Sequence, residues 1–428
     1  MSELRYHNIP AWVDHLRSSR ILSLMVGLEP SQTPGVGSYY DLMDRLWLGN
    51  PGAESGPTRS LRSFTRKPAK KLGKNQKQPP RHPGIIQKLV DQALQGRDLD
   101  SRPELLMQQI FAKVGVEPSA KAGLLGDVKD LSVSGDGTCI NSGGSSYGIK
   151  VCKCRRQGIY DCDCKRRFSD PDARFGWDSY HECWFYGHTG YILTVHNKEL
   201  KCELPLYLRL VQASRHDGVS AVFALQEAQL LYDTYIVGSF HGDGAHDNYA
   251  MYHYLDQCGI KAFIPLNDTN KGNFKYPPHV RVDEHGVPVC MAGHKAVFWG
   301  FNNGRCRLKY RCPLAVGRID SCPCKQDCSP SHYGRCFYTK PSWDLRLFTE
   351  VPRGSEEWKR MMNSRTSSER VNKRLLNDYG LELSRTRGKM RTFWWSVVHS
   401  VNIHLDSRLK ASGFSFVTML EDLIVAAA

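Results

Sequence analysis

Apolar residues recur with helical spacing through the first part of the chain. Helices are predicted for residues 9–28 and 101–116. The segment GIIQKLVDQALQ lies between them and has one apolar helical face, formed by Ile86, Leu89, Val90 and Leu94. We therefore expect an N-terminal helical segment over residues 1–57 and a second helical region over residues 83–126.

From about residue 130 the pattern changes to strands alternating with helices. Strands are predicted at residues 129–140, 182–195, 203–214, 234–240 and 261–267, with helices at 220–233 and 247–259. The loop HNKELKC would join the second and third strands in an antiparallel pair. This order predicts a mixed α/β core beginning in residues 127–269. Residues 270–350 interrupt it with Gly, Pro, Cys and aromatic residues, and a helical pattern resumes at 356–380 to complete the core within 351–428.

The charge balance points to a polyanionic partner. The 428 residues include 58 Lys and Arg against 43 Asp and Glu, a formal net charge of +15. Nucleic acid is the commonest partner of such a surplus, and a basic protein without one is the alternative. Ten Lys or Arg and no acid lie between Arg59 and Lys88. We expect a basic, proline-rich arm over residues 58–82 that contacts phosphates, or else a solvated loop, and DNA binding or dimerisation by region 83–126.

Two features bear on where the protein acts. No apolar run reaches the roughly 18 residues that a membrane span needs, and the first residues lack the apolar stretch of a secretory signal. We therefore expect a soluble, cytoplasmic protein with no membrane partner.

The chain has 15 cysteines, which is many for a cytoplasmic protein, and an odd number without a secretory signal argues against a disulfide framework. Four of them form a C-x-C, seven-residue, C-x-C pattern: Cys152, Cys154, Cys162 and Cys164. Four thiolates this close can bind a tetrahedral Zn²⁺, so we predict a structural zinc site, with free thiols in a loop as the alternative. A second group, four of which could bind another ion, is Cys306, Cys312, Cys322, Cys324, Cys328 and Cys336. The remaining five are expected to be core or isolated thiols: Cys139, Cys183, Cys202, Cys258 and Cys290.

Three acids are candidates for a catalytic site. Asp136 is predicted at the end of the first strand, Asp243 just after a later strand, and Glu369 on the late helix. Mg²⁺ and Mn²⁺ prefer hard oxygen ligands, and two such ions can stabilise both oxygens of an in-line phosphoryl displacement. Each acid also has an ordinary interpretation, because Asp-Gly is a common turn and a lone Glu on a basic helix usually forms an ion pair.

The segments around these acids resemble the ordered motifs of a known family. SGDGTCI is similar to a first-strand motif, VGSFHGDGAHDNYAMYHYLDQCGIKAFIPLN to a second motif, and NSRTSSERVNKRL to a helical third motif. Together they resemble the DDE transposases of prokaryotic insertion sequences, of the cut-and-paste type. The resemblance spans about residues 130–400 and assigns Asp136, Asp243 and Glu369 as the catalytic acids.

The resemblance implies a fold and a reaction. The fold would be a ribonuclease-H-like α/β sheet flanked by helices, with a helical N-terminal region and a cysteine-rich insertion before the last catalytic helix. The protein would bind the terminal inverted repeats of its element, cleave there and join the 3′-hydroxyls to target DNA. Asp136 and Asp243 would hold both of two Mg²⁺ or Mn²⁺ ions and Glu369 the second, while Arg365 would contact a phosphate or orient Glu369. Double-stranded DNA would be bound by a homodimer or larger oligomer at the nucleoid.

Some positions depart from the family pattern. The third motif usually has a Tyr and a Lys where this chain has Met362 and Leu376, and His246 stands at a usual Tyr position of the second motif. Asp247 matches a second Asp of that motif, and we expect it to be structural. The alternative functions are a nuclease or domesticated transposase without strand transfer, and a non-catalytic, cysteine-rich DNA-binding regulator.

Overall fold

The computed structural model describes residues 4–6, 8–49, 58–59, 84–96, 102–267, 274–324 and 328–413. The predicted basic arm falls almost entirely outside these residues, so its interpretation stays a prediction. No helix in the described ranges is both long and apolar enough to cross a lipid bilayer.

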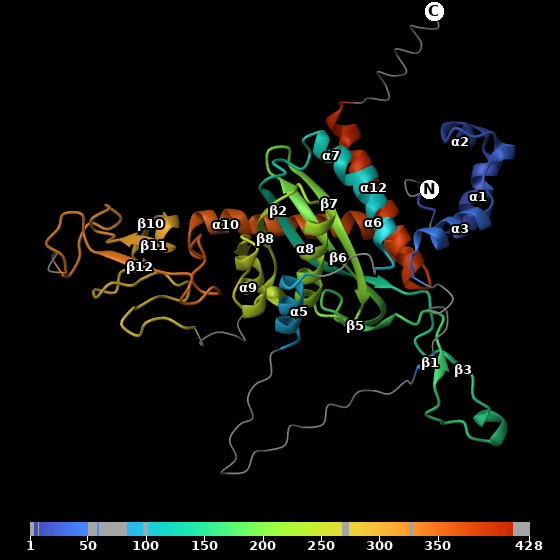
Figure 1. Cartoon of the computed structure of the whole chain (residues 1–428), viewed down its shortest axis with the longest axis horizontal. Coiled ribbons are helices and arrows are strands. Elements are labelled where there is room, and N and C mark those ends of the chain that lie inside the picture. The colour runs from blue at the N-terminus through green and yellow to red at the C-terminus, as the bar shows by residue number, and fades with distance from the viewer. Residues whose placement is uncertain are drawn as a thin grey trace, which may run out of the picture.

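A six-stranded sheet lies at the centre of the described structure (Figure 1). Its strands are β2 (Leu131–Asn141), β5 (Arg174–Asp178), β6 (Cys183–Asn197), β7 (Cys202–Gln212), β8 (Val237–His241) and β9 (Lys261–Phe263). The order is β5-β6-β2-β8-β9, and β7 pairs with β6 beyond the end of β5. Strand β6 is antiparallel to β2, β5 and β7, whereas β8 is parallel to β2 and β9. The predicted mixed sheet, including its antiparallel pair of long strands, is confirmed.

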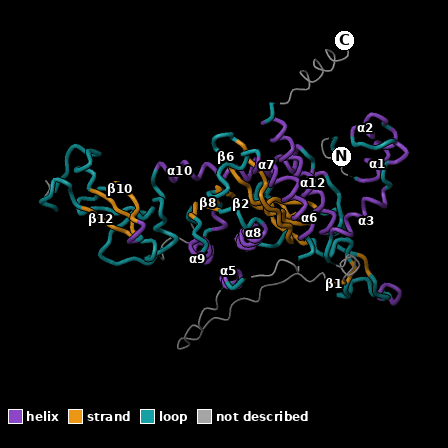
Figure 2. Tube along the Cα trace, turned by 45° about the horizontal axis from the view of Figure 1, so that its top comes forward, coloured by secondary structure: helices purple, strands orange, loops and turns teal. Residues whose placement is uncertain are grey.

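Helices cover both faces of this sheet (Figure 2). One face has α8 (Asp217–Leu231) and α9 (Tyr249–Gln257), against which α5 (Ile85–Leu94) packs. The other face has α11 (Thr366–Lys373) and α12 (Lys389–Ala411). Successive residues of a strand point to opposite faces. Accordingly, Ser134 of β2 hydrogen-bonds Ser367 of α11 at 2.7 Å, while Gly137 of β2 faces Asp217 of α8.

Helix α8 shows why this layer forms. Its residues are apolar on nearly all sides, and a helix of that kind must be buried. The fully buried side chains of α8 include Ala221, Val222, Ala224 and Leu225. The helix therefore fills the space between the sheet and the α5–α9 layer.

The front of the chain packs onto the core. Region 83–126 is divided between the two faces of the sheet, because α5 lies beside α8 whereas the rest lies beside α12. That rest consists of α6 (Leu105–Phe111), a π-helical turn (Ala112–Val116) and α7 (Glu117–Lys121). The predicted helix over 9–28 is in fact two helices, α1 (Ile9–Ser18) and α2 (Arg20–Met25), because Ser19 between them is extended and caps α2. Helix α3 (Val36–Leu46) packs against α1 and reaches α12.

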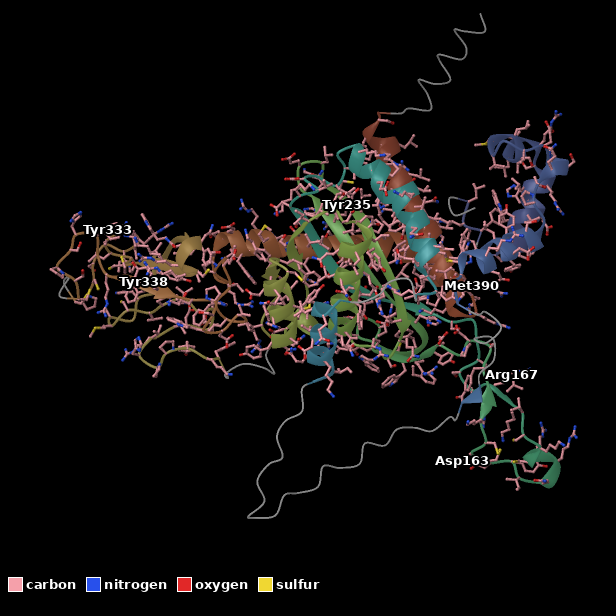
Figure 3. The ribbon with its side chains drawn as sticks, viewed as in Figure 1. Asp163, Arg167, Tyr235, Tyr333, Tyr338 and Met390 are labelled. Atoms are coloured by element: carbon pink, nitrogen blue, oxygen red, sulfur yellow. The ribbon has the colours of Figure 1, made fainter. Side chains whose placement is uncertain are left out.

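Two excursions leave the core at opposite ends (Figure 1). The first, which we call the ribbon, is residues 142–170 between β2 and β5, and contains β3 (Ile149–Lys150), a 3-10 turn (Cys154–Gln157) and β4 (Arg166–Arg167), with β1 (Thr58–Arg59) paired to β4. The second is the predicted insertion. Its described part has a three-stranded sheet of β10 (Val297–Asn302), β11 (Arg307–Arg311) and β12 (Cys336–Thr339). Figure 3 shows Asp163 and Arg167 on the ribbon, and Tyr333 and Tyr338 on the insertion.

Helix α10 (Glu356–Met362) returns the chain to the core. It is followed by a 3-10 turn (Asn363–Arg365), by α11 and by a π-helical turn (Arg374–Asp378), so the predicted helix over 356–380 is nearly continuous. Four short 3-10 turns complete the described elements, at Pro30–Gln32, Gly244–His246, Asn303–Arg305 and Leu381–Leu383.

Candidate active site

Asp136 lies in the middle of β2, not at the strand end as predicted. The strand runs on to Asn141 because β6 continues to pair with it, whereas pairing with β8 stops at Ser134. Asp136 is therefore the second residue past the parallel pairing, where β2 and β8 diverge. Its half-buried side chain accepts a hydrogen bond from the amide of Asn372 on α11, with 3.0 Å between Nδ2 and Oδ2.

Asp243 follows β8 and faces the same place. Its carboxylate accepts a hydrogen bond from the backbone N–H of Ala245 at 3.0 Å and one from Nδ1 of buried His246 at 2.6 Å. Burial opposes ionisation, but the bond from His246 and the charge of Arg365 hold the pKa of Asp243 below its ordinary value. Asp243 is thus ionised and oriented.

A buried hydrogen-bonded chain fixes His246. An ionised carboxylate can only accept, so Nδ1 of His246 donates to Asp243, and Nε2 is hydrogen-bonded to the hydroxyl of Tyr191 at 2.8 Å. Tyr191 lies on β6, and its hydroxyl occupies the space that a side chain at position 135 would need, so Gly135 leaves room for it. Buried His246 therefore holds the carboxylate of Asp243 in position.

A third aspartate, missed by the sequence analysis, joins this group. Asp217 begins α8, and a Cβ atom at position 137 would come within 2.5 Å of its Oδ1. Gly137 is therefore needed for the close approach of α8 to β2. One sequence signal could have revealed it: the chain has three Asp-Gly pairs, and all three lie here, at Asp136, Asp217 and Asp243.

Two of these aspartates, Asp136 and Asp217, have raised pKa values. Burial first, and then the negative charges of Asp217 and Asp243, raise the pKa of Asp136 to about 7. Burial also raises the pKa of Asp217, and His246 only partly offsets this rise. A group of acids in which one is held ionised while its neighbours resist ionisation is a strong candidate for a functional site.

Glu369 of α11 is linked to this group through Arg365. Glu369 Oε1 and Arg365 Nη1 are 2.7 Å apart, one turn apart on the helix, and Arg365 also acts on the charge of Asp243. The Glu369 side chain is 49% exposed, so it is free to reorient at little energetic cost. Arg365 therefore lies where it can orient Glu369.

The acids are grouped but not tightly packed. Within the described residues, the only set of three or more His, Cys, Asp or Glu side chains whose ligand atoms all lie within 4.8 Å of one another is formed by the ribbon cysteines. Asp136, Asp243 and Glu369 are thus more widely spaced than the ligands of a single preformed ion. Asn372 adds another oxygen, because its buried Oδ1 has no hydrogen-bond partner among the described residues.

Asp247 does not share this site. Both of its oxygens pair with the buried guanidinium of Arg346, at 2.6 Å each, and one also accepts from the backbone N–H of Asn267. Such a bidentate pair is a rigid link, here between the start of α9 and the segment before α10. The expected structural role of Asp247 agrees with this geometry.

The ribbon brings its four cysteines together as predicted. The Sγ atoms of Cys152 and Cys162 are 3.5 Å apart, as are those of Cys154 and Cys164, and all four lie within 4.8 Å of one another. Tetrahedral zinc with bonds of about 2.3 Å would require sulfurs about 3.8 Å apart. This cysteine cluster can therefore hold a structural metal such as zinc.

The thiols of the ribbon do not ionise together without a cation. The backbone N–H of Cys154 and the thiol of Cys162 lower the pKa of Cys152 to about 7, while the neighbouring thiol of Cys164 helps to raise the pKa of Cys154 to about 12. The first thiolate formed thus suppresses the next, and a bound divalent ion would remove that penalty.

The base of the ribbon is fixed to the core. Asp170 is fully buried and accepts hydrogen bonds from Ser142 at 2.6 Å and from His188 at 3.0 Å. Burial opposes ionisation, yet the bond from His188 holds the pKa of Asp170 at about 2. The two ends of the ribbon are therefore joined at β6, whatever happens at its tip.

Comparison with protein-family models and with curated proteins finds no match to this chain. Its function must therefore be argued from its own residues.

Proposed function

We propose that the protein is a DNA transposase that uses Asp136, Asp243 and Glu369 for metal-dependent phosphoryl transfer. The observation that carries the proposal is the meeting of distant acids: the charge of Asp243 raises the pKa of Asp136, Asn372 of α11 hydrogen-bonds Asp136, and the charge of Arg365, just before α11, acts on Asp243. The ordered motifs around the three acids supply the reaction class.

The sheet supports a ribonuclease-H-like assignment for the core. Three successive long strands, β2, β6 and β7, form an antiparallel unit, and two shorter strands, β8 and β9, follow in parallel on the other side of β2. The acids then lie where β2 and β8 diverge, with a helix of the late chain packed over them. Such a divergence is a common position for sites in α/β sheets.

The donor set fits magnesium or manganese. It consists of carboxylates, with an amide oxygen of Asn372 that lacks a partner, and these are the hard ligands such ions take. When bound, the ions would supply a nucleophilic water and stabilise charge on the phosphate. Asp136 and Asp243 would hold both ions and Glu369 the second. His246 keeps Asp243 ionised and aimed, and Arg365 orients Glu369 or contacts a phosphate.

The DNA would be bound by the basic surface of a dimer or larger oligomer. The net charge of +15 supports this partner, since every phosphate contact releases counterions. The ribbon adds seven Lys or Arg residues at one end of the molecule: Lys150, Lys153, Arg155, Arg156, Lys165, Arg166 and Arg167. No sequence-reading element is assigned, because the charge alone gives affinity without specificity.

A cleavage and joining assay tests the proposal. The full chain is incubated with a labelled duplex that carries the DNA flanking its own gene, with a supercoiled plasmid as target, and with Mg²⁺, Mn²⁺ or EDTA. We expect nicks at the element end and covalent joining to the plasmid with either metal, and neither product in EDTA.

Matched variants sharpen the result. Glu369→Gln should abolish both products, whereas Glu356→Gln, which breaks a similar helical ion pair with Lys359 at 2.8 Å, should retain them. Cleavage without joining would contradict the transposase proposal in favour of a nuclease. Tight DNA binding with no cleavage under any metal would favour the non-catalytic regulator.

A further inference from the structure

The insertion has too little apolar core to be stable by itself. The hydrophobic cluster around its three-stranded sheet has only three buried residues, Ala296, Leu308 and Tyr310, packed with four partly buried neighbours. Units with so small a core usually need a disulfide or a metal. No disulfide is formed by its described cysteines. Something else must hold these loops.

Its thiols gather around one small cavity. The cavity has a volume of about 20 Å³, room for a single ion or water. The cysteines that line it are Cys290, Cys312, Cys322, Cys324 and Cys328. The Sγ atom of Cys324 is 3.1 Å from that of Cys322 and 3.7 Å from that of Cys328. The 3.7 Å between Cys324 and Cys328 is close to the roughly 3.8 Å expected for two sulfurs on one zinc ion. No three ligand atoms of this lining all lie within 4.8 Å of one another, so a bound ion would draw the other ligands inward.

This lining differs from the group expected from the sequence. Cys290 belongs to it although it was expected to be a core or isolated thiol. Cys306 and Cys336 are not among the lining residues. The Cys306 thiol donates to the backbone oxygen of Asn303 at 3.3 Å, and Cys336 of β12 lies opposite Arg311 of β11 in the small sheet. Proximity in the sequence was thus a poor guide in this region.

A tight turn adds a histidine to the same cavity. The backbone N–H of Cys290 donates to the oxygen of His294 at 2.9 Å, and that of Gly293 donates to Cys290 at 3.0 Å. Gly293 has φ +83°, a conformation that favours glycine. His294 lines the cavity, and its buried Nε2 has no hydrogen-bond partner among the described residues. A buried ring nitrogen on this lining needs a polar partner, and a metal ion could serve as that partner.

We propose that this cavity is a second zinc site, with Cys290, His294, Cys324 and Cys328 as ligands. The ligands form two pairs in the sequence, Cys290-x₃-His294 and Cys324-x₃-Cys328, and both have the ligand spacing of structural zinc sites. Binding of Zn²⁺ would release the thiol protons and give Nε2 of His294 its missing partner. The ion would join the turn before β10 to the loop before β12, and so stabilise the insertion.

Metal analysis of the reduced, full-length protein tests this site separately from the ribbon. We expect two zinc ions per chain in the wild type, one in a variant with Cys152, Cys154, Cys162 and Cys164 changed to Ser, and none when Cys328→Ser is added. His294→Ala in the ribbon variant should also lose the ion. The control substitutions Cys306→Ser and Cys336→Ser should keep it.

Cobalt substitution provides a second measurement. Co²⁺ added to the ribbon variant should give the visible spectrum of tetrahedral coordination with thiolates, and Cys290→Ser should remove it. A folded ribbon variant with no bound metal and no such spectrum would overturn the proposal. Iron in place of zinc, or loss of the ion on Cys306→Ser, would overturn it as well. None of these readouts uses DNA, so they are independent of the proposed reaction.

Discussion

The carboxylate site and the ribbon site differ in how far apart in the chain their ligands lie. The four ribbon cysteines fall within 152–164 and are brought together by one hairpin and one turn. The acids come from β2, α8, the loop after β8 and α11, so they meet only when the whole sheet has formed. Loss of the ribbon site should therefore disturb only the ribbon, whereas the carboxylate site can form only when the core is folded.

The two sites also differ in their exposure to solvent. The ribbon thiols lie on an excursion from the core, with Cys164 exposed, while Asp136 lies in the central sheet and is packed against α11. Water screens the first group, but burial penalises every charge in the second. The carboxylate site therefore stores unfavourable electrostatic energy that a cation can relieve. The predictions below test this contrast.

The largest effect is expected from Asp136→Ala. Changes to groups that merely support metal ligands cost about 10- to 100-fold, so losing a ligand should lower cleavage by at least about 100-fold. DNA affinity and zinc content should not change, because no positive charge and no thiol is removed. Cleavage is measured on labelled end DNA, and affinity by titration. Normal cleavage by this variant would exclude Asp136 from catalysis.

Ribbon substitutions should remove one metal ion but leave the core intact. Cys162→Ser combined with Cys164→Ser leaves two thiols, too few for structural zinc. We expect faster hydrogen exchange in residues 143–169 and an unchanged thermal midpoint of the core, since Asp170 still anchors the base. The exposed Cys183→Ser serves as the control. Unfolding of the core in the double variant would show that the ribbon is not an independent unit.

The stability of the metal-free protein should depend on Asp136 and pH. The pKa of Asp136 is raised from 3.8 to about 7 by burial and by Asp217 and Asp243, so the folded state keeps a proton that the unfolded chain loses in this interval. Stability therefore falls as pH rises from about 4 to about 7 and then levels off. Asp136→Asn should avoid this loss and be more stable than wild type at about pH 8, by at most about 4 kcal/mol.

Urea unfolding in EDTA measures this difference. At about pH 4 the variant and the wild type should be similar, because Asp136 is protonated in the folded state. Adding Mg²⁺ at the higher pH should stabilise the wild type and not the variant. Parallel pH profiles for the two proteins would contradict the electrostatic part of the account.

The smallest effect is expected from Tyr191→Phe. It removes the hydroxyl that fixes His246, and so loosens Asp243 without removing a charge. Cleavage should fall by about 10-fold, the lower end of the range for supporting groups. Tyr186→Phe on the same strand, whose hydroxyl donates to the backbone of Asp170, is the control. An unaffected Tyr191→Phe protein would show that the chain of hydrogen bonds is not needed.

The cysteine site of the ribbon, most strands of the mixed sheet and most helices could be predicted because each depends on neighbours in the sequence. Alternating apolar residues define β6 and β7, and the spacing of four cysteines defines the ribbon site. Asp243 was placed after its strand for the same reason. These features need only local periodicity and a short turn.

The remainder depends on contacts between distant segments. Asp217 looks like an ordinary helix-starting Asp, and only the approach of α8 to β2 makes it part of the site. Asp136 looked like a strand end because the sequence does not show that β2 continues to pair with β6 after its pairing with β8 has ended. Cys290 and His294 join the insertion thiols only through the folded turn before β10.

Manganese binding tests most directly whether the carboxylates form a metal site. Paramagnetic resonance of the zinc-loaded, full-length protein should show two bound Mn²⁺ ions per chain. Asp136→Asn and Asp243→Asn should each reduce that number, and Glu356→Gln should leave it unchanged. Mn²⁺ binding that is identical in the wild type and both aspartate variants would contradict the account.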